Sequence, residues 1–237
     1  MTVTTRTSPP RDLASWNRDL NRTHAMAAWR ARSGWVVRWI EARRRRLVAE
    51  AVGRLAPRVV VDVGCEDGWI AEAYVDGVDD LTLLDLDAGP LEASVLAGRA
   101  GVRIAEADAT SQASLASVLE RASVDVVVLS ALLEHLPEPD EALGALRPFL
   151  VPGGHFVVYV PADRPILAAK QMLKLTGTGG LVRGLSLDEA PGHLQVFTRA
   201  RLRRLLAPWG TVERLTFDPA VLGYLAVVRV PSARGRA

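Results

Sequence analysis

The chain has 237 residues, and 49% of them are hydrophobic, so it is long enough to enclose one sizeable core. No apolar run reaches the 18 or more residues that a membrane-spanning helix needs, and the first residues lack the apolar core of a secretory signal. The single cysteine, Cys65, excludes an internal disulfide and a cysteine-based metal cluster. We therefore expect a cytoplasmic protein without a metal site.

The first 50 residues form a basic segment. They carry eleven arginines against four acidic residues, although the whole chain has a net charge of only +2. Residues 1–11 are expected to be disordered, and residues 12–55 show helical periodicity that is interrupted near Ser33 and Gly34. The arginines could meet phosphates, an acidic lipid surface or the acidic remainder of the chain, or they could line a solvated helix face. We assign residues 1–54 to an N-terminal helical extension.

Alternating strands and helices follow from residue 58 onward. Val-rich strands in such an alternation favour a parallel sheet with helices on both faces. The last two strands are separated by three residues and are expected to form an antiparallel hairpin. We assign residues 55–237 to one α/β domain. The expected strands cover 58–63, 80–86, 102–107, 124–130, 154–160, 211–217 and 221–230, and the expected helices cover 68–75, 88–99, 111–122, 139–149 and 198–207.

The most informative segment is VVVDVGCEDGW, residues 59–69. An apolar strand ends at Asp62, and Gly64 and Gly68 allow the backbone to turn and to approach a ligand closely. This is how an α/β sheet forms a nucleotide-like binding site. The loop lacks the Gly-x-Gly-x-x-Gly spacing of nicotinamide-binding proteins, which argues against a dehydrogenase.

Further polar residues follow the next strands. Asp85 ends the second strand, 21 residues beyond Gly64, where doubly wound folds place a carboxylate that binds ribose hydroxyls. Asp108 follows the third strand and could accept a hydrogen bond from an adenine amino group, while the Ala109 N–H donates to a ring nitrogen. Ser130, at the end of the fourth strand, would line the same crevice.

Taken in order, and with LEHLPEPDEAL followed by LRPFLVPGG, these segments resemble class I S-adenosylmethionine-dependent methyltransferases. The resemblance covers about residues 55–230 and is strongest to the small-molecule group that includes ubiquinone and menaquinone methyltransferases. It implies a Rossmann-like sheet of seven strands whose last strand is antiparallel, and S-adenosyl-L-methionine as the cofactor. The cofactor-binding residues that we carry over are Asp62, Gly64, Cys65, Glu66, Gly68, Asp85, Leu86, Asp108, Ala109 and Ser130.

One residue departs from this family pattern. Glu66 stands where the family's first motif usually has glycine, so its side chain must avoid the cofactor or turn toward the sulfonium or amino group. The backbone would be strained if this position requires a positive φ. Cys65 beside it is interpreted as a small filler rather than a nucleophile.

Two histidines are the catalytic candidates. His135 follows the fourth strand and could act as a general base near pH 7, or it could brace the turn at Leu136 and Pro137. His193 lies near the end of an insertion at residues 161–197 and could reach a substrate or lock the insertion by a backbone hydrogen bond. The insertion itself reads as a short helix and a glycine-rich loop. It could be a substrate lid, a lipid-facing surface, or a helix packed on the N-terminal segment.

The resemblance implies methyl transfer to a hydroxyl or amine of a small molecule such as a specialised metabolite, quinone, sugar or lipid. An RNA acceptor is the first alternative, motivated by the basic segment but opposed by the acidic remainder and by the lack of a recognisable RNA-binding module. A protein that binds the cofactor without turnover is the second, motivated by Glu66. Peripheral membrane contact through the basic helices or the insertion stays open, as does the oligomeric state.

Overall fold

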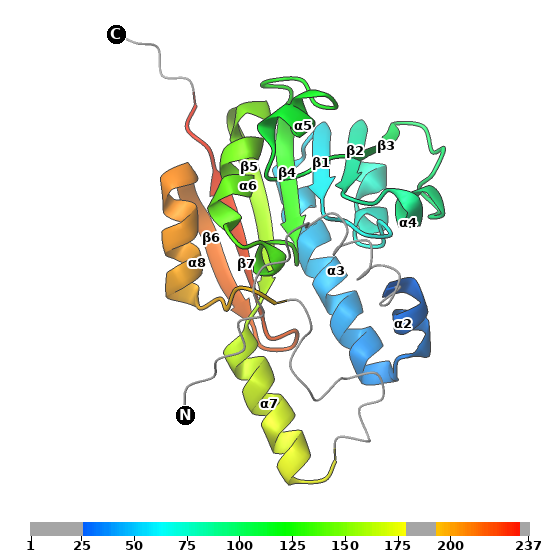
Figure 1. Ribbon diagram of the computed structural model, residues 1–237, viewed down its shortest axis with the longest axis vertical. Coiled ribbons are helices and arrows are strands. Elements are labelled where there is room, and N and C mark those ends of the chain that lie inside the picture. The colour runs from blue at the N-terminus through cyan, green and yellow to red at the C-terminus, as the bar shows by residue number, and fades with distance from the viewer. Residues whose placement is uncertain (1–25, 179–192, 233–237) are drawn as a thin grey trace.

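The computed structural model describes residues 26–178 and 193–232. The start expected to be disordered, the first part of the expected helical segment and the glycine-rich part of the insertion lie outside these ranges. The described residues form a sheet with helices on both sides (Figure 1). The strands are β1 (Val59–Val63), β2 (Asp80–Asp85), β3 (Val102–Glu106), β4 (Val124–Ser130), β5 (Leu150–Pro161), β6 (Thr211–Asp218) and β7 (Gly223–Arg229).

The seven strands of the sheet are arranged in the order β3-β2-β1-β4-β5-β7-β6. The strands from β3 to β5 run parallel, and β7 is antiparallel to both β5 and β6. The order of the strands reverses beside β1, since β1 pairs with β2 on one side and with β4 on the other. In open α/β sheets, ligands bind at such a reversal, at the carboxyl ends of the strands. The predicted Rossmann-like fold and the closing hairpin are confirmed.

Helices cover both faces of this sheet. On one face α3 packs with the segment after β1 and with α4, and on the other face α5, α6 and α8 pack together. Figure 1 shows α3 crossing one face and continuing beyond the carboxyl ends of the strands. The helices are α2 (Met26–Arg32), α3 (Trp35–Leu55), α4 (Gly89–Glu92), α5 (Gln112–Ala116), α6 (Pro139–Leu146), α7 (Asp163–Leu175) and α8 (Arg199–Leu206).

The long helix α3 illustrates why these residues form their elements. Its apolar residues Leu47, Val48, Ala51 and Val52 recur at helical spacing and are buried against the sheet. Each such aliphatic side chain larger than alanine stabilises the fold by about 1.5–3 kcal/mol when it is removed from water. The helix ends at Ala56, which adopts a left-handed conformation and donates its N–H to the Gly53 carbonyl.

Three expected helices are shorter than predicted. The segment expected to be helical over 68–75 forms only two 3₁₀ turns, Ala71–Ala73 and Val75–Gly77. The helix expected over 88–99 is the single turn of α4, and the one expected over 111–122 is α5. In the segment 88–99, the Ser94 hydroxyl accepts the Leu96 N–H and Gly98 adopts a positive φ, so local turns replace the helical hydrogen bonds.

The break between α2 and α3 was predicted correctly. Ser33 lies between the two helices, and its hydroxyl donates to the Trp29 carbonyl at 2.8 Å. In the described part of the chain, none of the helices combines the length and the apolar character that crossing a bilayer would require.

Candidate cofactor and acceptor site

The glycine loop after β1 has the geometry that its sequence predicts. The Gly64 N–H donates to the Leu84 carbonyl at 2.7 Å, which joins the loop to the end of β2. Gly64 and Gly68 both adopt positive φ, at +67° and +73°. A Cβ atom on Gly64 would lie 2.8 Å from a methyl carbon of Leu132, so a side chain here would also have to displace the Leu132 side chain after β4.

Asp62 lies beneath this loop rather than on its surface. Its side chain is 1% exposed, and the Tyr74 hydroxyl donates to its Oδ2 at 2.5 Å. Burial raises the pKa of Asp62 to about 7, although the hydrogen bond from Tyr74 opposes this shift. The carboxyl group therefore supports the loop from below, and any contact with a ligand would be made from within the packed interior.

Asp85 occupies the end of β2 and faces the glycine loop. Its two oxygens accept the Glu66 N–H at 3.0 Å and the Asp87 N–H at 3.3 Å. Burial raises the pKa of Asp85, and these backbone donors oppose the shift. Asp85 thus stands at the end of the second strand, where doubly wound folds place the carboxylate that binds a ribose diol.

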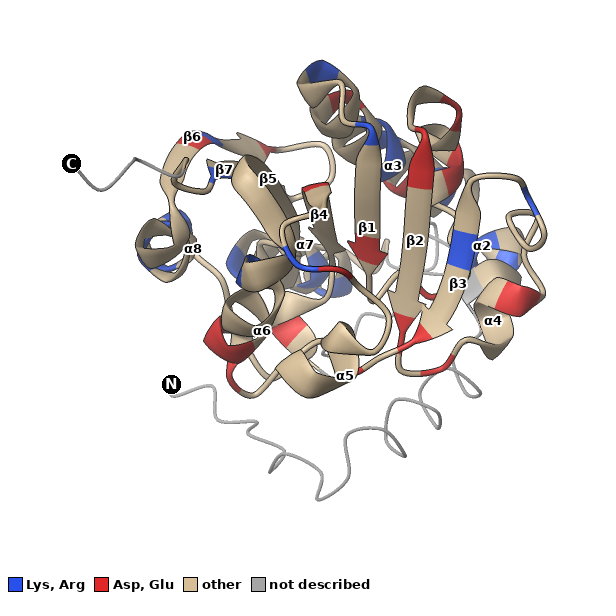
Figure 2. Cartoon of the chain, turned by 90° about the horizontal axis from the view of Figure 1, so that it is seen from above, with Lys and Arg blue, Asp and Glu red and all other residues tan. Residues whose placement is uncertain are grey.

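Asp108 and Ala109 lie at the same edge, one strand further along. The Ala107 N–H donates to the Asp85 carbonyl at 3.0 Å, which joins the segment after β3 to the end of β2. One Asp108 oxygen accepts both the backbone N–H and the hydroxyl of Thr110, at 2.8 and 2.7 Å. Asp62, Asp85 and Asp108 thus follow three adjacent strands at one edge of the sheet, and Figure 2 shows acidic residues at the ends of β1 and β2.

Glu66 adopts a φ of +52°, so it takes up the left-handed conformation that the sequence analysis associated with backbone strain. Burial raises the pKa of Glu66 to about 7, while the positive charge of Arg44 lowers it and the nearby Asp67 adds to the rise. The side chain also lines a groove of about 640 Å³ between α2 and α4, together with Arg30, Trp69 and Pro90. Glu66 is therefore turned toward the N-terminal helices.

Arg44 is a functional candidate that the sequence analysis did not single out. It extends from α3, pairs with Glu41 at 2.7 Å and places its guanidinium carbon 5.9 Å from the centre of the Tyr159 ring. Burial lowers the pKa of Arg44, but the negative charges of Glu41, Glu66 and Glu134 outweigh this effect and the pKa is raised. Within the described part of the chain, its buried Nε has no hydrogen-bond partner. The run Arg43–Arg46 was the only signal for it.

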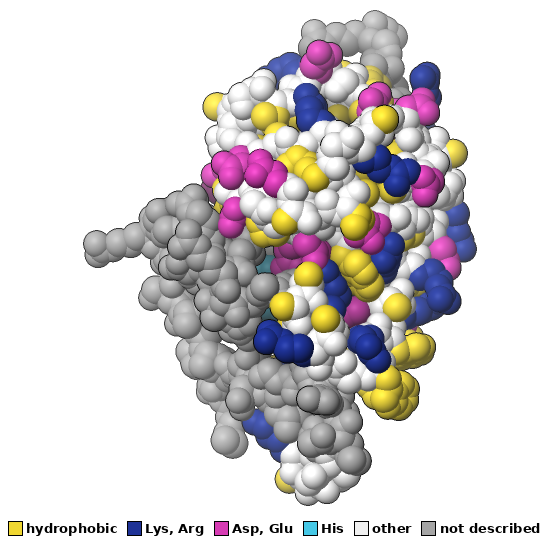
Figure 3. Space-filling model, turned by 90° about the vertical axis from the view of Figure 1, so that its right-hand side faces the viewer, with side chains coloured by type: hydrophobic (Ala, Val, Ile, Leu, Met, Phe, Trp, Pro, Cys, Tyr) yellow, Lys and Arg dark blue, Asp and Glu magenta, His cyan; other side chains and the backbone are white. Residues whose placement is uncertain are grey.

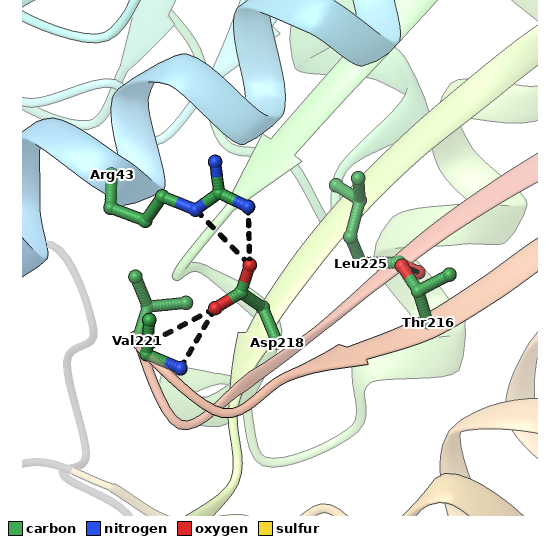
Figure 4. Close-up of polar contacts among 6 residues, drawn as sticks. Arg43, Thr216, Asp218, Val221 and Leu225 are labelled. Atoms are coloured by element: carbon green, nitrogen blue, oxygen red, sulfur yellow. Dashed lines mark hydrogen bonds and ion pairs between the residues drawn. The ribbon is translucent and has the colours of Figure 1, made fainter.

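The N-terminal helices α2 and α3 contact the glycine loop, and α3 also contacts the hairpin formed by β6 and β7. Arg30 and Arg45 lie 4.7 and 4.9 Å from the centre of the Trp69 ring, and Arg30 also pairs with Asp67. Arg43 pairs with Asp218 at 2.9 Å, in the turn between β6 and β7 (Figure 4). The arginine-rich segment thus binds acidic groups of the chain's own body.

The end of β4 brings the two candidate histidines together. Ligand atoms of Glu134, His135 and His193 all lie within 4.8 Å of one another, and the two imidazole rings meet edge to face at 5.1 Å between centroids. The N–H groups of Leu194 and Gln195 both donate to the Glu134 carbonyl, at 2.8 and 3.0 Å. These backbone bonds hold the segment after the insertion against the turn after β4. Two imidazoles and a carboxylate can share a proton, and the same donor set could hold a divalent cation.

The remaining predicted residues are Ser130, Cys65 and Leu86. The Ser130 hydroxyl is buried and has no hydrogen-bond partner among the described residues. The Cys65 sulfur lies 3.6 Å from the Leu84 carbonyl, and burial raises the pKa of the thiol well above its ordinary value. This is the environment of a packed thiol rather than of a nucleophile. Leu86 follows Asp85 at the strand end and is partly exposed.

Comparison with known proteins places this site in a family. A family model for a methyltransferase domain matches residues 37–210, and the chain belongs to this methyltransferase family. Its relatives include the ubiquinone biosynthesis O-methyltransferase of Serratia proteamaculans, 32% identical over 56% of this chain and 57% of that protein. A second O-methyltransferase of that name, from Alkalilimnicola ehrlichii, is 28% identical over 79% of each chain.

Solved structures agree on the fold. The crystal structure of the N-methyltransferase NodS from Bradyrhizobium japonicum in complex with S-adenosyl-l-homocysteine covers 81% of this chain and 88% of its own, with a TM-score of 0.55 and 16% identity. The sequence-based identification of a class I S-adenosylmethionine-dependent methyltransferase is confirmed at the level of family and fold.

Proposed function

We propose that this chain transfers a methyl group from S-adenosylmethionine to a hydroxyl or amine of a small molecule, such as a quinone, a lipid, a sugar or a specialised metabolite. The observation that carries this proposal is the meeting of two groups at one sheet edge. Acidic residues stand at or directly after the ends of β1, β2 and β3, and His135, which follows β4, is in ring contact with His193.

The residues at this edge fit the cofactor. Asp85 would accept the ribose hydroxyls, and Asp108 and Ala109 would meet the adenine. Two buried polar atoms without partners in the described structure, Ser130 Oγ and Arg44 Nε, suit the polar methionine end, and the cation suits its carboxylate. When it is bound, S-adenosylmethionine supplies a methyl group that its sulfonium charge already activates.

The chain itself has to align an acceptor and to manage its proton. Alignment alone can contribute several kcal/mol, because the donor needs no further activation. A hydroxyl acceptor keeps its proton until the reaction, so we assign proton removal to the imidazole pair of His135 and His193. Glu134 would stabilise the imidazolium that forms. An amine acceptor would need only to arrive uncharged.

The test is incubation of the purified chain with an isotope-labelled methyl donor and a cell extract, followed by identification of the labelled product. A labelled small molecule supports the proposal, and label in the RNA fraction would establish the RNA alternative instead. Asp85→Asn should abolish the labelling. Asp80→Asn is the matched control, because Asp80 is exposed at the opposite end of the same strand.

A cofactor-binding protein without turnover is the second candidate, and Glu66 favours it. A buried, partly protonated carboxyl stands in the loop that would surround the methionine end. Calorimetric binding of S-adenosylhomocysteine together with no methyl transfer to any extract would favour this reading. Restoration of transfer by Glu66→Gly would show that this residue is the cause.

A further inference from the structure

Large hydrophobic side chains protrude at one end of the molecule. Trp35 and Trp39, on the first turns of α3, are 74% and 54% exposed. Met172 and Leu175, on the last turns of α7, are 60% and 83% exposed. Both helix ends lie at the lower end of the molecule in Figure 1, and Figure 3 shows large hydrophobic side chains standing out there. We call these four residues the apolar tip.

Each pair lies on one side of its helix. Residues four apart, such as Trp35 and Trp39, and three apart, such as Met172 and Leu175, are neighbours on a helical surface. The buried residues of α3 lie on other positions of the same helix, from Val37 and Glu41 onward. The tryptophans are therefore not part of the core. Large hydrophobic side chains that are exposed together mark interaction sites, so their exposure indicates a partner outside the described fold.

The surroundings of the apolar tip are basic. Arg32 at the end of α2 and Arg38 on the first turns of α3 are exposed beside the two tryptophans. The helix α2 contains no acidic residue, and the first one on α3 is Glu41, which is buried and pairs with Arg44. Cations that flank exposed tryptophans are the combination found where proteins rest on anionic bilayers.

We propose that the apolar tip and its flanking cations form a docking surface for a bilayer that contains anionic lipids. Tryptophan is suited to this position because its ring is apolar and its indole N–H stays hydrated. The contact would be peripheral, since none of the described helices is both long and apolar enough to cross the bilayer. A second copy of the chain is a poorer occupant, because a two-fold contact would place these cations against one another.

The docking surface lies at the end of the molecule that also carries the candidate cofactor and acceptor site. The carboxyl edge of the parallel strands points toward the same end of the molecule (Figure 1). The helix α7 begins directly after β5, and the Ala162 N–H before it is fixed to the Leu222 carbonyl at 2.8 Å. Delivery of a membrane-dissolved acceptor to the site would follow from this placement. That consequence rests on the proposed function, whereas the docking itself does not.

The experiment is cosedimentation of the full chain with vesicles of phosphatidylcholine that contain about one third phosphatidylglycerol, the anionic component. The double variant Trp35→Ser/Trp39→Ser should bind at least about tenfold more weakly, because two large apolar groups no longer enter the interface. Arg32→Gln and Arg38→Gln should each weaken binding about fivefold, and added salt should do the same. Phe217→Ser, an exposed aromatic residue on β6, is the matched control and should bind like the wild type.

Three results would overturn the proposal. The wild type could ignore anionic vesicles, the tryptophan double variant could bind as well as the wild type, or the wild type could be a dimer that the same double substitution dissociates. Circular dichroism and thermal melting verify that each variant is folded. Calorimetry with S-adenosylhomocysteine separates the two proposals, because loss of that binding would contradict the proposed function and leave vesicle binding unaffected.

Discussion

At the ends of β1, β2 and β3 the site is built from residues close to their strands, whereas at the end of β4 it is built from side chains that distant elements bring together. In the first region, backbone N–H groups and strand-end carboxylates bind one another, as in the bond from Glu66 to Asp85. In the second, α3 contributes Arg44, β4 is followed by Glu134 and His135, and the end of the insertion contributes His193.

This difference separates two tasks. The first region is fixed by glycine conformations and by sheet pairing, so it can bind one invariant group. The second depends on long side chains and on two backbone hydrogen bonds to Glu134, so its shape can change without disturbing the sheet. We therefore expect substitutions in the first region to affect cofactor affinity and those in the second to affect turnover.

The largest effect is expected for the histidines. His135→Ala or His193→Ala should lower turnover of a hydroxyl acceptor by about 100-fold or more, because the proton acceptor is lost. Affinity for S-adenosylhomocysteine should not change. Steady-state kinetics test this, with His155→Ala as a control that pairs with Glu213 away from the site. Full turnover in both variants would refute the assignment.

Asp85→Asn tests the first region directly. The amide keeps the shape of the side chain but loses the charge, so affinity for S-adenosylhomocysteine should fall by about 30- to 100-fold. Titration calorimetry measures this, and Asp80→Asn should bind normally. Equal affinity of both variants would mean that Asp85 supports only the glycine loop.

Arg44→Met tests whether the two regions meet at the methionine end of the cofactor. The substitution keeps much of the apolar stem and removes the charge, so affinity should fall by about tenfold while the acceptor KM changes less. Arg46→Met on the exposed side of the same helix is the control. A change confined to the acceptor KM would place Arg44 in the acceptor region instead.

Substitution of Glu66 should give the smallest effect, and this effect should be on the stability of the protein. Glu66→Gly relieves a left-handed conformation and should raise the free energy of unfolding by about 1 kcal/mol. The pKa of Glu66 rises from 4.5 to about 7 on folding, so the native state holds the extra proton. Stability from this group is therefore complete below pH 4.5 and decreases as the pH rises through 7. Glu66→Gln should remove this slope, as urea unfolding at pH 5 and pH 8 would show. An identical slope in Glu66→Gln would assign it to Asp62.

The first region could be read from the sequence because each of its residues follows a strand at a fixed spacing. Apolar runs located the strands, and Gly64, Asp85 and Asp108 then had to meet at one edge, since parallel strands end together. The departure of Glu66 from the glycine of the family pattern pointed to this position, and the structure gives it a positive φ. The shortened helices around α4 and α5 were not predicted, because serine side chains and glycine turns compete locally with a helical pattern.

The second region was predicted only in part, because no spacing rule connects its members. His135 and His193 were chosen for their chemistry, and their contact depends on how the insertion returns to β4. Arg44 is one of four consecutive arginines, and only packing of α3 decides which of them turns inward. Glu134 reads as an ordinary acidic residue until its burial at 1% exposure is seen.

The paired backbone bonds to the Glu134 carbonyl mean that His193 is anchored by the polypeptide that follows it rather than by the insertion that precedes it. Lengthening, shortening or exchanging residues between α7 and His193 would therefore leave this histidine in register with His135. The length and sequence of that stretch can accordingly be varied without moving the two histidines that we propose as the proton acceptor.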